Sequence, residues 1–100
     1  MSVDRSRLAA LMAEEVARFE AERPQSKAQF EIAKSSMPDG VPMLWMAKWP
    51  GPWPVYVESA KGAHFTCVDG IDHVDLCLGD TGAMVGHSPK PTVRAVTALL

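Results

Sequence analysis

The chain has 100 residues, a formal net charge of −2, 47% hydrophobic residues and 22% charged residues. This length allows one domain with a modest core, and the composition argues against a wholly disordered chain. The weakly acidic balance gives no basic surface for nucleic acid or for an anionic membrane. Two cysteines are too few for a disulfide framework, and no apolar window reaches transmembrane length. We therefore expect a cytoplasmic protein that binds neither nucleic acid nor membrane.

Two helices are predicted at the start of the chain. Apolar residues recur at helical spacing over residues 4–22, and Pro24 is expected to end this helix. Ser26 and Gln29 match a capping-box pattern, which predicts a shorter second helix at about 27–36.

Residues 38–54 are rich in proline and tryptophan. Such proline density forbids regular sheet pairing and favours an extended, partly polyproline path. The three tryptophans of this segment need a surface on which to lie, so we expect it to pack across a larger body or to line a cleft. These tryptophans are Trp45, Trp49 and Trp53.

A three-stranded antiparallel meander is predicted over residues 54–78. Stretches of alternating apolar and polar residues flank a turn at Gly62, which predicts a β-hairpin. A second turn at Gly70 leads to a third strand at 73–78. With the helices, this sheet predicts an α+β fold.

A glycine-broken loop at 79–88 and a helix at 89–100 complete the chain. The glycines match neither a Walker motif nor a dinucleotide fingerprint, which favours a flexible strand-to-helix connection over a phosphate site. The last helical pattern has no stop signal. We therefore expect residues 1–100 to be a piece of a longer protein.

Four residues invite a metal-binding interpretation: His64, Cys67, His73 and Cys77. Zinc sites usually take two ligands from a tight pair such as Cys-x-x-Cys, and the two cysteines here are ten residues apart. Buried strand cysteines are the better prediction, and we expect no metal.

Asp80, His87 and Ser88 are the polar groups of the glycine-rich loop. Taken singly, Asp80 is expected to cap or solvate its turn, and His87 or Ser88 to cap the helix that follows. No catalytic triad can be assembled from these residues, and we predict no catalytic residue in the chain.

Six short motifs occur in an order that is familiar as a set. They are MPDGV at 37–41, PVYVE at 54–58, GAHF at 62–65, VDG at 68–70, VD at 74–75 and GHSP at 86–89. This order resembles the N-terminal region of class III (fold-type I) aminotransferases, in the branch that contains glutamate-1-semialdehyde aminomutase. The first motif resembles the family's MPGGV, and the last resembles its GHxHP with the second histidine absent.

The resemblance implies a cofactor, pyridoxal 5'-phosphate, held as a Schiff base on a lysine. No lysine of this chain lies in the family's lysine context, so the 100 residues are expected to be inactive alone and to hold no cofactor ligand. By resemblance they supply substrate-pocket and homodimer contacts. The implied substrate-binding residues are Trp45, Met46 and Trp49 in one segment and Gly79, Asp80, Thr81 and Gly82 in another.

Three functions stay open at this point. The family resemblance favours transfer of an amino group between an amino acid or amine and a carbonyl acceptor. A second possibility is the intramolecular amino transfer of a glutamate-1-semialdehyde 2,1-aminomutase. A third, of another class, is a protein-interaction module that uses the tryptophan and proline segment. A cofactor absorbance band in the full-length protein distinguishes the enzymes from the module.

Overall fold

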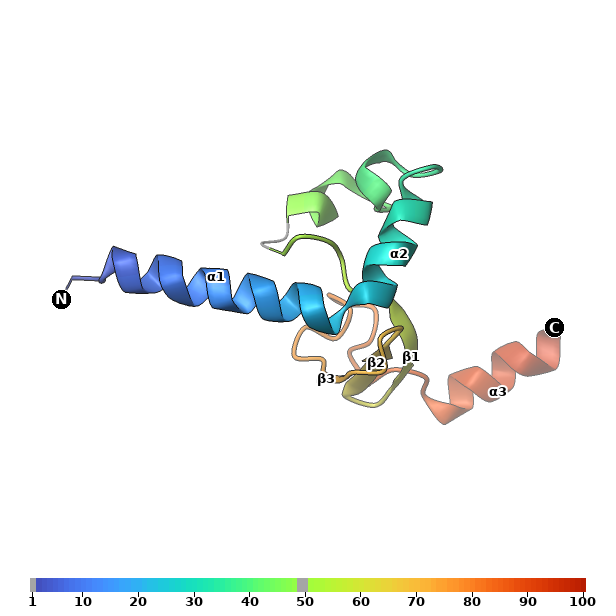
Figure 1. Cartoon of the computed structure of the whole chain (residues 1–100). Helices are drawn as coiled ribbons and strands as arrows, with labels where there is room; N and C mark the ends of the chain where they lie inside the picture. The colour runs from blue at the N-terminus through green and yellow to red at the C-terminus, as the bar shows by residue number, and fades with distance from the viewer. Residues whose placement is uncertain (1, 49–50) are drawn as a thin grey trace. The chain divides into compact units, whose positions relative to one another are not determined.

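The structure is a computed structural model that describes residues 2–48 and 51–100. The chain, which the sequence presented as one segment, divides into two compact units, Met1–Val55 and Tyr56–Leu100. The first unit carries two helices and two short 3-10 turns, and the second carries a three-stranded sheet and a helix (Figure 1). Each unit is described by itself below.

Helix α1, Arg5–Glu22, confirms the first predicted helix. Asp4 caps it, because its carboxylate Oδ1 accepts a hydrogen bond from the Arg7 N–H at 3.0 Å. None of the α1 residues is buried within its unit. The apolar side of the helix remains exposed at Leu8, Leu11 and Met12.

Helix α2, Pro24–Ala33, begins three residues before the predicted start at 27. Pro24 ends α1 as expected, but it also opens α2, because proline has no N–H to lose at the first helical position. Ser26 is therefore not an N-cap; it lies inside the helix and is fully buried. The helix also stops short of 36, where the Ser35 hydroxyl donates to the Ile32 carbonyl at 2.7 Å and competes with further helical turns.

The expected extended path over 38–54 is wrong in two places, where the chain forms the 3-10 turns η1, Pro38–Gly40, and η2, Leu44–Lys48. Gly40 has φ +69°, and a Cβ there would lie 2.6 Å from Phe30 Cε2. Only glycine therefore fits beside this ring. The short distance from Gly40 to Phe30 shows that η1 packs closely against α2.

Trp53 is the tryptophan that finds a surface within the first unit. Its ring lies 5.5 Å from the Phe19 ring of α1, and its Nε1 donates to the Arg23 carbonyl at 3.2 Å. The Arg23 guanidinium in turn lies 4.6 Å from the centre of the Phe19 ring. This aromatic contact joins the end of the proline-rich segment to the junction of α1 and α2.

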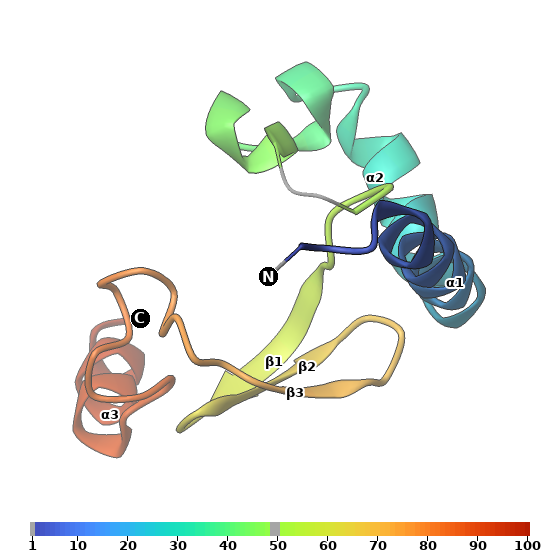
Figure 2. The ribbon, with the colours of Figure 1, turned by 90° about the vertical axis from the view of Figure 1, so that its left-hand side faces the viewer.

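The second unit confirms the antiparallel meander: strands β1, Val57–Lys61, β2, His64–Cys67, and β3, Asp72–Val74, lie in that order (Figure 2). The turns fall at Gly62 and Gly70 as predicted, with φ of +61° and +77°. The strands are shorter than expected, and the third ends at Val74 instead of 78. The reason is Asp75, whose carboxylate takes up the next backbone N–H groups.

Helix α3, Lys90–Leu99, has Pro89 as its N-cap and no side-chain cap. The prediction that His87 or Ser88 caps it is wrong, since the Ser88 hydroxyl donates instead to the Ala60 carbonyl at 2.8 Å. The buried-cysteine prediction holds for Cys67, which is fully buried in β2. It is wrong for Cys77, which is exposed and lies outside the strands. No helix in the described part of the chain is long and apolar enough to cross a membrane.

Candidate functional site

The loop between β3 and α3 is fixed at its first residue by Asp75. One carboxylate oxygen, Oδ1, accepts hydrogen bonds from the N–H groups of Cys77 at 3.0 Å and Leu78 at 2.8 Å. The other, Oδ2, accepts from His87 Nε2 at 2.6 Å. The pKa of the Asp75 carboxyl lies below its ordinary value, chiefly because of the His87 hydrogen bond and also because of the two backbone bonds. Burial opposes this effect without reversing it.

The far end of the loop is fixed at His87. Its N–H donates to the Gly62 carbonyl at 2.8 Å, and its carbonyl accepts from the Gly62 N–H at 3.0 Å. Gly86 has φ +89°, and a Cβ there would lie 3.2 Å from Gly62 Cα. The chain can approach the β1–β2 turn this closely because the residue is glycine.

Between these ends lies an unusual turn at residues 78–82, which we name the acidic turn. Leu78, Gly79 and Asp80 have φ of 55°, 58° and 66°, three left-handed residues in succession. For a residue such as Leu78 this conformation costs about 1–2 kcal/mol. The turn is closed by Ala83, which is buried and whose N–H donates to the Leu78 carbonyl at 2.9 Å. Strain of this kind, held by surrounding contacts, is typical of functional loops.

The structure gathers four of the predicted substrate-binding residues, Gly79, Asp80, Thr81 and Gly82, on the exposed acidic turn. In the part of the chain that the structure describes, the Asp80 carboxylate takes part in no hydrogen bond or ion pair. The backbone of the turn is therefore fixed while its one charged side chain faces solvent. This arrangement can present a carboxylate to a cationic ligand.

The other predicted residues lie in the first unit, on the η2 turn Leu44–Lys48, which we name the aromatic turn. Trp45 is 53% exposed. Met46 is half-buried and lines a hollow of about 380 Å³ together with Phe30 and Trp53. The remaining predicted residue, Trp49, lies outside the described residues.

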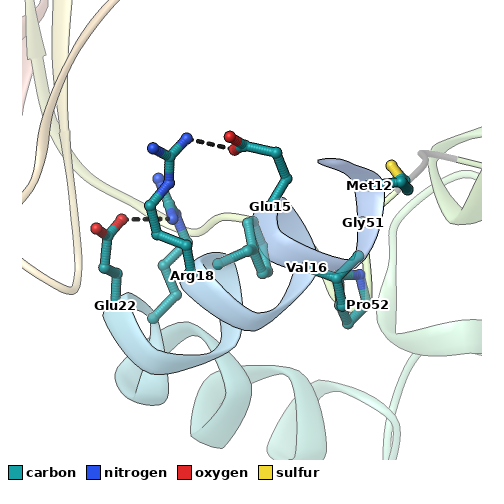
Figure 3. A pocket seen from close by; sticks show the side chains of 9 residues that line it. Met12, Glu15, Val16, Arg18, Glu22, Gly51 and Pro52 are labelled. Carbon is teal, nitrogen blue, oxygen red and sulfur yellow. Dashed lines mark hydrogen bonds and ion pairs between the residues drawn. The ribbon is translucent and has the colours of Figure 1, made fainter. Parts of the chain in front are cut away.

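A larger hollow of about 580 Å³ runs along α1 and was not predicted (Figure 3). Its charged groups are paired, since Arg18 bonds to Glu15 and Arg23 to Glu22. The sequence signal for it was the helical spacing of apolar residues over 4–22. The residues that line it are Met12, Glu15, Val16, Arg18, Phe19, Glu22, Arg23, Gly51 and Pro52.

The described residues do not fit a pyridoxal phosphate site of their own. Lys34 pairs with Glu31 and also lies 4.9 Å from the centre of the Phe30 ring. Lys27 lies 5.2 Å from the centre of the Trp53 ring. Lys34 lines the hollow of about 380 Å³, but its ammonium is engaged by Glu31 and by the Phe30 ring. Within residues 2–48 and 51–100 no group of three or more His, Cys, Asp or Glu could hold a metal ion.

The pairing of Asp75 with His87 was not predicted from the sequence. Both residues occur in the short motifs, and His87 was predicted only as a helix cap. Their pairing links residues that are twelve apart in the sequence. The signal that could have revealed it is a single polar residue, Asp75, between the third strand and the glycine-rich loop. That signal is weak without the fold.

Comparison with known proteins identifies the group to which this fold is related. No family model matches the chain. It is 44% identical over 70 residues to a glutamate-1-semialdehyde 2,1-aminomutase of Methanoculleus marisnigri, which is 70% of this chain and 16% of that protein. The chain thus spans about a sixth of the length of this relative.

Solved structures give the same result. A glutamate-1-semialdehyde aminomutase from Pseudomonas aeruginosa PAO1 matches with a TM-score of 0.89 at 34% identity, over 99% of this chain and 22% of that one. A β-phenylalanine aminotransferase from Variovorax paradoxus matches with a TM-score of 0.77 at 26% identity, over 87% and 20%. A variant of the Pseudomonas enzyme was solved in complex with PMP.

These matches show the class of fold: the chain has the fold of one region of the fold-type I, pyridoxal-phosphate-dependent transaminases. Within that class it is homologous to glutamate-1-semialdehyde aminomutases. The resemblance stated from its motifs is confirmed.

Proposed function

We propose that the chain is part of a pyridoxal-phosphate-dependent class III aminotransferase that moves an amino group between an amino acid or amine and a carbonyl acceptor. The observation that carries this proposal is the match of nearly the whole chain to an aminomutase fold, with the acidic turn already formed. In the whole protein we assign this chain to substrate binding and homodimer contact. We expect it not to be competent alone, because no lysine of the chain lies in the family's lysine context.

The cofactor, when bound, supplies an aldehyde that accepts the amino group from the donor and passes it to the acceptor. The residues that would hold it belong to other parts of the whole protein. What this chain contributes is position and polarity around the substrate. These contributions raise the rate by holding the reactants in one geometry.

In this proposal the two turns have different tasks. Asp80 offers an unpaired carboxylate, which favours a substrate that carries an ammonium or other cationic group. Trp45 and Met46 offer apolar surface for an uncharged substrate side chain, and by resemblance we assign Trp49 to the same task. The segment around them has Lys48 but no arginine, and only arginine grips a carboxylate with two parallel hydrogen bonds. This composition favours intermolecular amino transfer over the aminomutase reaction.

The aminomutase reaction remains the second candidate because of what the relatives are. An interaction module is the third candidate, and the half-exposed Trp45 is the observation that supports it. A homodimer is part of the proposal, because the exposed apolar side of α1 suits a contact with a second copy. We also propose a cytoplasmic location, which fits the two free cysteines.

The test uses the purified full-length protein. We expect a visible cofactor absorbance band that fades when an amino donor is added and returns when a carbonyl acceptor follows. Net transfer between two molecules identifies a transaminase, whereas isomerisation of a single substrate identifies an aminomutase. A colourless protein that transfers no amino group contradicts both and leaves the interaction module.

Asp80→Ala tests the acidic turn directly. We expect kcat/KM for cationic substrates to fall about tenfold, the effect of losing one charge-assisted contact. Asp72→Ala is the matched control, since Asp72 is an exposed aspartate of the same unit outside the loop. Equal substrate profiles for Asp80→Ala and the wild type would remove Asp80 from the proposal.

A further inference from the structure

We propose that Asp75 and His87 are positioning residues that together hold the acidic turn, and with it Asp80, in the geometry that binds substrate. We name this pair the latch. The inference rests on the proposed function and deepens it, because it states how the substrate-binding turn is kept in shape. Neither residue is placed in contact with the substrate.

The latch joins the two ends of the loop between β3 and α3. The Asp75 N–H donates to the Ala63 carbonyl at 2.8 Å, and His87 makes two backbone hydrogen bonds with Gly62. Both ends of the loop therefore rest on the same β1–β2 turn. The side-chain bond of 2.6 Å between His87 Nε2 and Asp75 Oδ2 then ties one end to the other.

Asp75 also fixes the entry into the acidic turn. Its Oδ1 accepts the N–H of Leu78, which is the first of the three left-handed residues. Leucine does not hold this conformation unaided. Gly79 and Asp80 follow Leu78 in the same left-handed conformation, so the carboxylate of Asp75 holds the backbone that leads to Asp80.

The ring of His87 supports the same turn. A Cβ placed on Gly79 would lie 3.8 Å from His87 Cε1, so the imidazole lies near this glycine. The His87 side chain is 22% exposed and the Asp75 side chain 12% exposed. A carboxylate accepts hydrogen bonds only, so His87 carries a proton on Nε2 in this pair. The latch thus combines a short, charge-assisted bond with an imidazole ring placed near the turn.

The chain contains a matched control for the latch. His64 Nδ1 and Asp72 Oδ2 form the same type of pair at 3.0 Å in the same unit. Their side chains are 55% and 62% exposed, so solvent competes for this bond. The pair joins β2 to β3 and makes no bond with the loop. Equal substitutions in the two pairs therefore separate positioning of the turn from the general loss of a His–Asp bond.

The test measures kcat and KM for the amino donor in the full-length holoenzyme carrying His87→Leu, His87→Gln or His64→Leu. We expect His87→Leu to lower kcat/KM tenfold to a hundredfold, on the order of the loss of a hydrogen bond to a charged group, mainly through a higher KM. Glutamine can still donate to Asp75, so His87→Gln should recover kcat/KM to within about threefold of the wild type. His64→Leu should change it less than about twofold.

A purely structural role predicts something else. His87→Leu would then lower the melting temperature and the yield of coloured holoenzyme, while KM of the folded enzyme stayed at the wild-type value. That result would overturn the inference. So would equal effects of His87→Leu and His64→Leu, or no recovery with His87→Gln.

Two further variants keep the test decisive if His87→Leu does not fold. Asp75→Asn keeps an acceptor for the two backbone N–H groups and replaces the charge-assisted bond to His87 with at most a neutral one. Because the latch depends on the charge-assisted bond, KM should rise in this variant, and an unchanged KM would overturn the inference. In the Asp80→Ala background, Asp75→Asn should cost less than in the wild type, because the latch acts through Asp80. A wild-type protein that shows neither cofactor absorbance nor amino transfer contradicts the proposed function itself, whereas an active wild type with an unaffected Asp75→Asn contradicts only the latch.

Discussion

The acidic turn and the aromatic turn carry the predicted substrate-binding residues, and they differ in how firmly their own unit holds them. The loop that carries the acidic turn has its ends joined by Asp75 and His87, and Ala83, which closes the turn, is buried. The aromatic turn is a 3-10 turn without a buried residue, and Trp45 is 53% exposed. Under the proposed function, we expect the firmly held turn to orient a polar substrate group and the exposed turn to adapt to an apolar one.

Two glycines, one in each unit, also differ in why the position requires glycine. Gly40 and Gly62 both have a left-handed backbone, with φ of +69° and +61°. A Cβ on Gly40 would collide with Phe30, whereas a Cβ on Gly62 would meet no atom within 4 Å. Position and conformation together decide the cost of a side chain, not conformation alone.

The largest expected effect is that of Gly40→Ala. Backbone strain and the collision with Phe30 should together lower the free energy of unfolding by about 3 kcal/mol. Gly62→Ala is the matched control and should cost only about 1 kcal/mol, from the backbone alone. Urea unfolding of the full-length protein measures both losses of stability. Equal losses would contradict the close contact of Gly40 with Phe30.

A smaller effect is expected from Trp45→Ala, which sharpens the contrast between the two turns. If the aromatic turn adapts to the substrate side chain, kcat/KM should fall about tenfold for donors with a large apolar side chain, since each buried CH₂ is worth about 0.8 kcal/mol. Donors with a small side chain should be almost unaffected. Steady-state kinetics with a series of donors measure this, and a uniform loss for all donors would contradict the assigned task.

The smallest expected effect concerns pH. The pKa of Asp75 lies below its ordinary value of 3.8, so its ionised form stabilises the folded unit. This contribution should be complete above about pH 3.8 and should disappear as the pH falls through the lower folded value. The difference in unfolding free energy between wild type and Asp75→Asn should therefore shrink in acid. A difference that stays constant from pH 6 to pH 3 would count against the Asp75 contacts.

Local patterns in the sequence predicted α1, the meander and its two glycine turns, because helical spacing, alternation and turn residues act over a few positions. The start of α2 was missed because Pro24 both ends one helix and opens the next. The 3-10 turn at Leu44–Lys48 was missed because proline density suggested an extended path. In each case a local rule allowed two outcomes, and the sequence pattern did not decide between them.

The candidate site was less accessible to prediction. Family resemblance alone pointed to residues 79–82, and no pattern showed that the chain is left-handed at three successive residues, 78–80. The pairing of Asp75 with His87 depends on a chain reversal that brings both onto the β1–β2 turn. Such a contact follows from the three-dimensional path of the loop, which residue type and spacing do not specify.

The most direct test of the central claim is amide hydrogen exchange in the ligand-free, full-length protein. If the latch holds the acidic turn, the Ala83 amide, which bonds to the Leu78 carbonyl, should exchange at least about tenfold more slowly than the amides of Leu44–Lys48. His87→Leu should remove this protection, and His87→Gln should keep it. Equally fast exchange at Ala83 and in the aromatic turn of the wild type would contradict the account.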